Sequence, residues 1–259
     1  MSTVSKAIEL LNLFSSERAE IRLSEFRRLT GRDKTTTYRH LSELVSTGLL
    51  EQDDTTRAYR MGPAVLRFSH IRELTVPRRA GVRRVLPMLA DVSGETAHAS
   101  ILQGNTLVSL ADHTSSQHSA RVVLDDAVLP FHATASGVAV LAFAGEKLKS
   151  AVFKKLPKYT EHTITDREEL ESLLCEVRNT GFGHTEHGFE LGVSGIAVPL
   201  FDSTNHVAGA VAIASVASRL DEDLARTIKN ELVRAARTIT KSWGGFVPVG
   251  LDAVWSAQI

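Results

Sequence analysis

The chain of 259 residues is 43% apolar and 23% charged, which is typical of a globular protein of one or two domains and excludes a disordered chain. Its single cysteine, Cys175, excludes an internal disulfide and a multi-cysteine metal site and favours a reducing compartment, so we expect a cytoplasmic protein. The net charge is zero, but residues 1–84 carry 16 Lys and Arg against 10 Asp and Glu, whereas residues 85–259 carry 14 against 20. The basic N-terminal third therefore suggests an anionic partner.

The N-terminal residues predict three helices followed by a small two-stranded wing. Apolar residues recur at helical spacing in the first and third segments, and glycines mark the ends of the second and third. The expected helices span residues 4–14, 23–29 and 33–47, and the expected strands span 49–51 and 58–61. Residues 1–62 are thus predicted to form a winged helix-turn-helix.

The third helix has two distinct faces when its residues are placed at 100° intervals. Tyr38, Leu41, Leu44 and Val45 gather on one face, which we expect to be buried. The opposite face carries hydroxyl and cationic groups, which can donate to phosphates and base edges in a major groove. A merely solvated charged face is the alternative. With the wing, the expected DNA-contacting residues are Arg32, Lys34, Thr35, Thr36, Arg39, His40 and Arg57.

The rest of the chain predicts a linker helix, a mixed α+β domain and a C-terminal tail. Residues 63–80 form the linker helix, whose apolar positions suit a dimer contact, and the arginines that follow residue 77 either touch DNA or line a solvated interdomain face. Within the domain of residues 81–243, a hairpin turn is expected at Gly104 and Asn105. The tail, residues 244–259, is either disordered or docks on a neighbouring molecule. The expected strands are 95–103, 106–113, 193–201 and 207–215, and the expected helices are 134–144, 166–180 and 221–243.

Several of these segments resemble the IclR family of transcriptional regulators, from about residue 4 to residue 243. Its DNA-binding domain resembles "SKAIELLNLF" and "LSEFRRLTGRDKTTTYRHLSELVSTGLLEQDDTTRAYRMGP". Its GAF-like ligand-sensing domain resembles "ETAHASILQGNTLVSL", "LPFHATASGVAVLAF" and "GVSGIAVPLFDSTNHVAGAVAIAS". The resemblance implies a regulator whose DNA binding responds to a small-molecule effector and which forms a homodimer or a tetramer. Paired recognition helices imply a roughly palindromic operator. Whether the regulator represses or activates stays open.

The same resemblance implies an effector pocket lined by Ala135, Ser136, Thr185, Val193, Gly195, Ala212 and Ala214. This chain departs from the family pattern at five positions, where the family often has a polar residue and this chain has an apolar one. Val138 stands where the family often has a lysine, Gly188 where it has an acidic residue, and Gly195 where it has a cysteine. Ala212 and Ala214 stand where serines are frequent. An unpaired buried polar group on a ligand costs about 1–3 kcal/mol. We therefore expect a larger, aromatic or otherwise less polar effector, unless Ser136, Thr185, His118 or Arg121 supplies the missing contacts. A closed, ligand-free pocket is the alternative.

An enzymatic function is not expected. The sequence contains no Gly-x-Ser-x-Gly elbow, no Gly-x-Gly-x-x-Gly motif and no Walker-type loop. His184 and His187, if they lie on one strand, point to opposite faces and make no metal-ligand pair, and His132 is expected to be structural. We expect no catalytic residue, no cofactor and no metal. A small-molecule sensor with vestigial DNA binding remains the alternative function.

Overall fold

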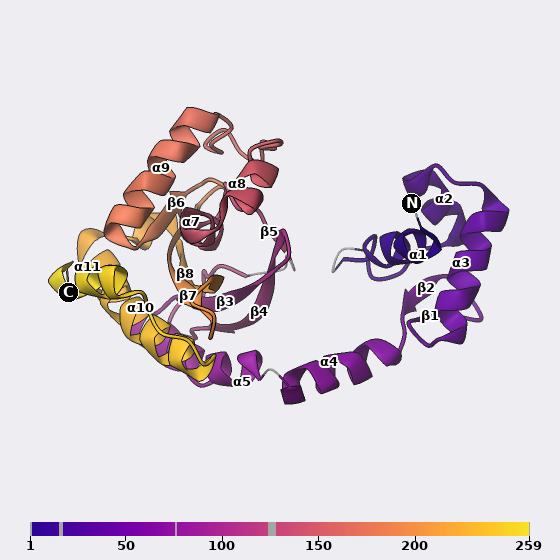
Figure 1. Cartoon of the computed structure of the whole chain (residues 1–259), viewed down its shortest axis with the longest axis horizontal. Coiled ribbons are helices and arrows are strands. Elements are labelled where there is room, and N and C mark those ends of the chain that lie inside the picture. Colours follow the sequence, from indigo (N-terminus) through magenta and orange to yellow (C-terminus); the bar gives the residue numbers. More distant parts are fainter. Residues whose placement is uncertain (1, 16–17, 76, 124–127, 259) are drawn as a thin grey trace. The chain divides into compact units, whose positions relative to one another are not determined.

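A computed structural model describes residues 2–15, 18–75, 77–123 and 128–258, and the chain divides into two compact units between residues 76 and 77 (Figure 1). Each unit has its own hydrophobic core. The predicted α+β class, with an N-terminal helix-turn-helix and a C-terminal mixed domain, is confirmed. Within the described ranges, every helix is too short or too polar to span a lipid bilayer.

The N-terminal unit is a winged helix-turn-helix followed by one further helix. Gly31 has a φ of 67°, the left-handed conformation that ends α2 and starts the turn to α3. The side chain of Asp33 caps α3 by accepting a hydrogen bond of 2.8 Å from the Thr36 amide. The elements are α1 (Thr3–Leu11), α2 (Leu23–Thr30), α3 (Lys34–Ser46), β1 (Leu50–Gln52), β2 (Tyr59–Met61) and α4 (Ala64–Thr75).

The core of this unit joins the three helices to the wing. Phe26 and Tyr59 are both buried and meet edge to face, with their ring centroids 6.0 Å apart. The backbones of Ile21 and Tyr59 exchange hydrogen bonds of 2.9 and 2.8 Å, which tie the segment before α2 to the second strand of the wing. The wing therefore has a fixed position against α2 and α3.

Helix α4 leaves its apolar residues in solvent. Leu66 and Leu74 are 75% and 70% exposed, and only Ala64 of this helix is buried. Val4 and Ile8 on α1 are also exposed. Because a monomeric protein rarely leaves so many large apolar side chains in water, the exposed apolar residues of α4 are a candidate interface, and those of α1 are a second one.

The C-terminal unit is built on a six-stranded antiparallel sheet with the order β5-β4-β3-β8-β7-β6. The predicted hairpin joins β3 to β4 through Gly104, which has a φ of 59°. The strands that sequence analysis placed at 193–201 and 207–215 are also present. The bounds are β3 (Thr96–Gln103), β4 (Thr106–Thr114), β5 (Val128–Leu129), β6 (Gly183–Glu186), β7 (Val193–Phe201) and β8 (Val207–Val216).

Helices cover both faces of this sheet, with α7 on one face and α10 on the other (Figure 1). Gly183 on β6 allows the close approach of α7, since a β-carbon there would lie 2.5 Å from the Ala135 carbonyl oxygen. Ile228 of α10 packs near Ile213 on the opposite face. The bounds are α5 (Arg78–Arg83), α6 (Leu86–Ser93), α7 (Ala135–Phe143), α8 (Glu146–Val152), α9 (Arg167–Thr180), the 3-10 helix η1 (Ala217–Arg219), α10 (Glu222–Ser242) and α11 (Val249–Gln258).

The C-terminal tail is part of this unit as far as Gln258, so the expectation that it is disordered is wrong over these residues. Residues 249–258 form α11, which packs beside α9. Trp255 is fully buried and its ring centroid lies 6.4 Å from that of Phe182. Gly181 leaves the space for the indole, because a β-carbon at that position would lie 2.1 Å from Trp255 Nε1.

The first residue of α5 is anchored to the end of α10. The guanidinium of Arg78 lies 4.9 Å from the centroid of the Trp243 ring, and Trp243 Nε1 donates a hydrogen bond of 3.1 Å to the Arg78 carbonyl oxygen. Arg78 also forms an ion pair of 3.5 Å with Asp202. Arg78 is thus a structural residue of the C-terminal unit.

Candidate DNA-binding surface and effector site

The outward face of α3 presents polar side chains from its first two turns. Lys34, Thr35 and Arg39 are exposed, and Thr36 is half-buried. Hydrogen bonds from Thr36 to Asp33 lower the pKa of that carboxyl, so it stays ionised as the helix cap. These side chains are available to a partner, and the helix that carries them begins at a well-defined cap.

Two residues of α3 lie on the opposite sides from those expected. Tyr38 is 52% exposed, whereas His40 is only 3% exposed. The buried sector is centred on Thr37, Leu41 and Leu44. Thr37 can be buried because its hydroxyl donates a hydrogen bond of 2.8 Å to the Asp33 carbonyl oxygen of the same helix. Burial lowers the pKa of His40, which therefore stays neutral. The prediction that His40 faces DNA is wrong.

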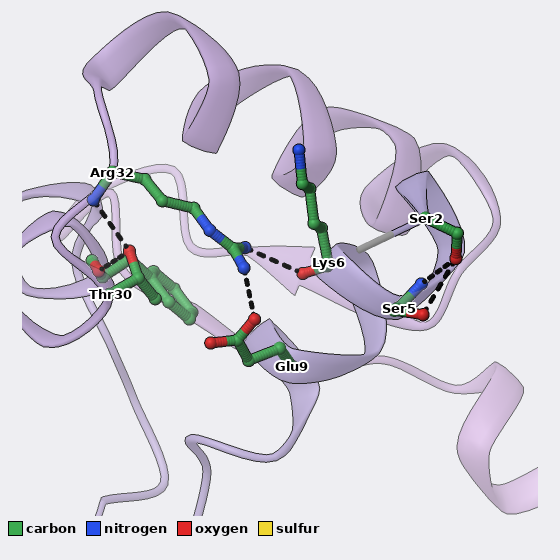
Figure 2. A network of polar contacts seen from close by, with 7 residues as sticks. Ser2, Ser5, Lys6, Glu9, Thr30 and Arg32 are labelled. Carbon is green, nitrogen blue, oxygen red and sulfur yellow. Dashed lines mark hydrogen bonds and ion pairs between the residues drawn. The ribbon is translucent and has the colours of Figure 1, made fainter.

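Arg32 belongs to the internal structure of the N-terminal unit. Its guanidinium forms an ion pair with Glu9 and donates a hydrogen bond of 3.1 Å to the Lys6 carbonyl oxygen (Figure 2). Its backbone amide donates to the Thr30 hydroxyl. Arg32 therefore fastens α1 to the turn between α2 and α3, and its assignment to the DNA-contacting face is corrected.

Arg57 stands at the tip of the wing, on a turn with internal hydrogen bonds. Asp53 Oδ1 accepts hydrogen bonds from the amides of Thr55 and Thr56 at 3.0 and 2.7 Å. Gln52 Nε2 donates to the Arg57 carbonyl oxygen at 2.9 Å, and Arg57 itself has a φ of 57°. The turn therefore presents an exposed guanidinium from a preorganised backbone.

The predicted effector residues of three strands lie in line across one face of the sheet. Thr185 on β6 pairs with Gly195 on β7, Gly195 pairs with Ala214 on β8, and Ala214 pairs with Thr96 on β3. Since side chains alternate along a strand, Val193 and Ala212 share this face with them.

The first turn of α7 completes the group. A β-carbon at Gly195 would lie 3.2 Å from the β-carbon of Ala135, so these two positions are in contact distance. Ser136 follows on the same helix and is buried. The structure thus brings together seven of the nine predicted effector residues, and small side chains predominate among them.

His98 is a polar residue of this face that sequence analysis missed. It lies opposite Ala212, and its Nε2 is 3.1 Å from the Ser136 hydroxyl. Its Nδ1 is buried without a hydrogen-bond partner among the described residues. The alternation of "ETAHAS" on β3, which puts His98 on the same face as Thr96, could have revealed it.

We expect His98 to make the C-terminal unit less stable in mild acid. Burial lowers the pKa of His98 to about 4 from 6.5. Its contribution to the free energy of unfolding is therefore fully present above pH 6.5 and is lost as the pH falls towards 4, by about 3 kcal/mol. Urea denaturation at stepped pH values, followed by tryptophan fluorescence, measures this loss. His98→Gln should flatten the profile between pH 6.5 and 4, and parallel profiles of the two proteins would contradict it.

His118 and Arg121 lie in the exposed segment that follows β4. His118 is beside Gly94, since a β-carbon there would be 3.1 Å from His118 Nε2. The segment reaches the effector face at Val122, whose carbonyl oxygen accepts a hydrogen bond of 2.7 Å from Thr96. Only Val122 of this segment is thus seen at the effector face, and contacts of His118 and Arg121 with an effector stay predictions.

The other histidines considered in the sequence have local structural partners. His132 is buried with its Nε2 2.9 Å from the Pro157 carbonyl oxygen, as expected for a structural residue. His184 Nε2 lies 3.1 Å from the Ser194 hydroxyl. His187 follows the end of β6, and its Nδ1 accepts a hydrogen bond of 2.9 Å from the Gly192 amide.

Comparison with known proteins defines the class to which this architecture belongs. Residues 3–54 match the IclR helix-turn-helix domain, and residues 74–241 match the C-terminal domain of bacterial IclR transcriptional regulators. The chain therefore belongs to the IclR family. It is a DNA-binding transcriptional regulator with a small-molecule effector domain, and it is not an enzyme.

Individual relatives span nearly the whole chain. The transcriptional regulator XynR of Escherichia coli is 25% identical over 246 residues, which cover 94% of this chain and 98% of XynR. A crystal structure of an IclR regulator from Silicibacter sp. TM1040 is 43% identical with a TM-score of 0.92 and covers 96% of this chain and 98% of that one. An IclR homologue from Microbacterium hydrocarbonoxydans, crystallised with 4-hydroxybenzoate, shares the fold at 23% identity, with a TM-score of 0.75 and coverage of 93% and 99%.

Proposed function

We propose that this regulator acts in the cytoplasm as a homodimer on a roughly palindromic operator. Lys34, Thr35, Thr36 and Arg39 contact DNA in the major groove, because they form the accessible face of α3. The exposed apolar residues of α4, with Val4 and Ile8 of α1, support a dimer contact within the N-terminal unit. Two recognition helices related by a two-fold axis then require half-sites about one helical turn apart.

We propose further that the effector is an aromatic or otherwise less polar acid. The observation that carries this proposal is the face formed by Ala135, Gly195, Ala212 and Ala214, which offers a ligand no hydrogen-bonding side chain. Ser136, Thr185 and His98 are the polar residues of the same face. A small dicarboxylate would leave charged oxygens unpaired there, whereas an aromatic ring buries apolar surface. The Microbacterium homologue crystallised with 4-hydroxybenzoate supports this class of ligand.

Effector binding regulates DNA occupancy only if the ligand prefers one conformation of the dimer. A coupling of about 1–3 kcal/mol between two sites changes an affinity by about 5–150-fold. The same coupling must appear in both directions, so bound DNA changes the affinity for the effector by the same factor. The proposal therefore requires two conformations of the dimer. They must differ in the placement of the paired recognition helices and in the affinity of the C-terminal unit for the effector.

Calorimetric titration of the full chain tests the effector class. We expect 4-hydroxybenzoate, as the aromatic probe, to bind at least about tenfold more tightly than succinate or malonate, because each unpaired polar group costs about 1–3 kcal/mol. Ala214→Ser restores a hydroxyl to the face and should narrow this preference. Tight binding of the dicarboxylates alone would overturn the proposed class, and an unchanged preference in Ala214→Ser would show that this face does not select the ligand.

A further inference from the structure

A hollow of about 520 Å³ lies between α2, α3 and the wing of the N-terminal unit. Its wall includes Arg22 and Ser24 at the start of α2, Lys34 and Tyr38 on α3, and Arg57 on the wing. Lys34 and Tyr38 are four residues apart, one turn along α3, and they adjoin Thr35 and Arg39 of the exposed face in sequence. The hollow therefore continues the surface that α3 presents to DNA.

The charge of this hollow is positive on all three sides. Arg22, Lys34 and Arg57 come from three different elements, and the described residues that line it include no carboxylate. Arg57 has one weak surface ion pair, at 3.9 Å to Asp54, in which both side chains are mostly exposed. Arg22 occupies the cap position of α2 and makes no side-chain capping bond, so the positive end of that helix adds to the field.

Tyr38 gives the hollow a donor in the right place for an anion. Its side chain is 52% exposed although it carries a large aromatic ring, and it lies beside the buried ring of Tyr59. A phenol hydroxyl on a fixed helix donates to a phosphate oxygen with little loss of conformational freedom. The wing opposite is held by the bonds of Asp53 and Gln52, so the distance across the hollow is set before a ligand arrives.

We propose that this hollow is a cradle for one backbone phosphate of the bound duplex. Tyr38 donates a hydrogen bond to the phosphate, while Lys34 and Arg57 neutralise it from α3 and from the wing. In this arrangement Arg57 contacts the DNA backbone and not a base edge. The contact to the phosphate sets how deeply α3 enters the major groove. The inference rests on the proposed DNA binding and adds Tyr38, Arg22 and Ser24 to the residues that contact DNA.

The test measures affinity and its salt dependence for a duplex selected from a random-sequence library with the full chain. Loss of one phosphate contact lowers the slope of log affinity against log salt concentration by about 1, equally on selected and scrambled duplexes. We expect this result for Arg57→Ala. Tyr38→Phe should weaken binding by about tenfold, since a hydrogen bond to a charged group is lost. Arg60→Ala is the matched control, because Arg60 is a cation of the same wing that is paired with Glu51 at 2.6 Å.

A scan of single methylphosphonate substitutions along the selected duplex identifies the phosphate. One neutral linkage should weaken binding of the natural chain more than any other linkage in this region. The same linkage should weaken Arg57→Ala and Tyr38→Phe by a smaller factor, because each variant has already lost one contact to that phosphate. Three results would overturn the cradle. Arg57→Ala and Arg60→Ala could change the salt slope by the same amount, or Tyr38→Phe could bind the duplex with the affinity of the natural chain. Arg57→Ala could also weaken binding to the selected duplex alone, as the loss of a base contact would. If no duplex is selected at all, DNA binding itself fails, which distinguishes the two proposals.

Discussion

Replacing Arg39 with alanine is expected to weaken binding to the selected operator by about 5- to 150-fold, which is the 1–3 kcal/mol that a bidentate contact to guanine provides. Arg39 is exposed on the second turn of α3, beyond the hydroxyls of Thr35 and Thr36. Its guanidinium is long enough to reach a base edge from that turn. Fluorescence anisotropy with selected and scrambled duplexes gives both affinities, and the loss should be larger for the selected duplex.

The control for this variant is Arg234→Ala. Arg234 is an exposed arginine of α10 in the other unit, paired on the surface with Glu231 at 2.7 Å. Its removal lowers the net charge by the same amount as Arg39→Ala. It should leave the affinities for both duplexes within about twofold of those of the natural chain, because an exposed ion pair contributes little to stability. An equal loss on selected and scrambled duplexes in Arg39→Ala would reassign Arg39 to a phosphate.

The largest loss of stability is expected for Trp255→Ala, at about 3–5 kcal/mol in the free energy of unfolding of the C-terminal unit. The indole is fully buried between α9 and α11, and it fills the space that Gly181 leaves open. Truncation removes this packing and leaves a cavity that the adjoining helices fill only in part. Urea denaturation followed by tryptophan fluorescence reports on this unit alone, since both tryptophans of the chain, Trp243 and Trp255, lie in it.

Val249→Ala serves as the comparison on the same helix. Val249 is 82% exposed at the start of α11, so its truncation should change the free energy of unfolding by less than about 0.5 kcal/mol. A loss below about 1 kcal/mol in Trp255→Ala would mean that α11 contributes little to the unit, contrary to its burial.

The sequence predicted the elements whose signals are local. The helices expected at 33–47 and 221–243 and the turn expected at Gly104 each depend on neighbouring residues, and the structure has them as α3, α10 and the hairpin between β3 and β4. Seven of the nine residues expected at the effector site lie together, because alternation along β6, β7 and β8 fixes which side chains share a face. Their contact with an effector stays a prediction.

Features that depend on distant contacts were missed. Helix α11 has a weak apolar pattern, and its position depends on Gly181 and Phe182, more than 60 residues earlier in the chain. Arg32 looked like a free cation because its partner Glu9 lies on another helix. The faces of α3 to which Tyr38 and His40 were assigned were wrong, because hydrophobicity alone favours a buried tyrosine. Thr37 occupies the core position instead, and its hydroxyl is satisfied by a hydrogen bond within the helix.

Chemical footprinting of the full chain on its selected duplex tests most directly whether the outward face of α3 reads DNA. Guanine N7 is accessible to methylation in the major groove, and a recognition helix there blocks it. We expect two protected blocks about 10 base pairs apart, at which Arg39→Ala restores reactivity and Arg234→Ala does not. Binding with major-groove reactivity unchanged, or with the same protection in Arg39→Ala, would contradict this orientation of α3.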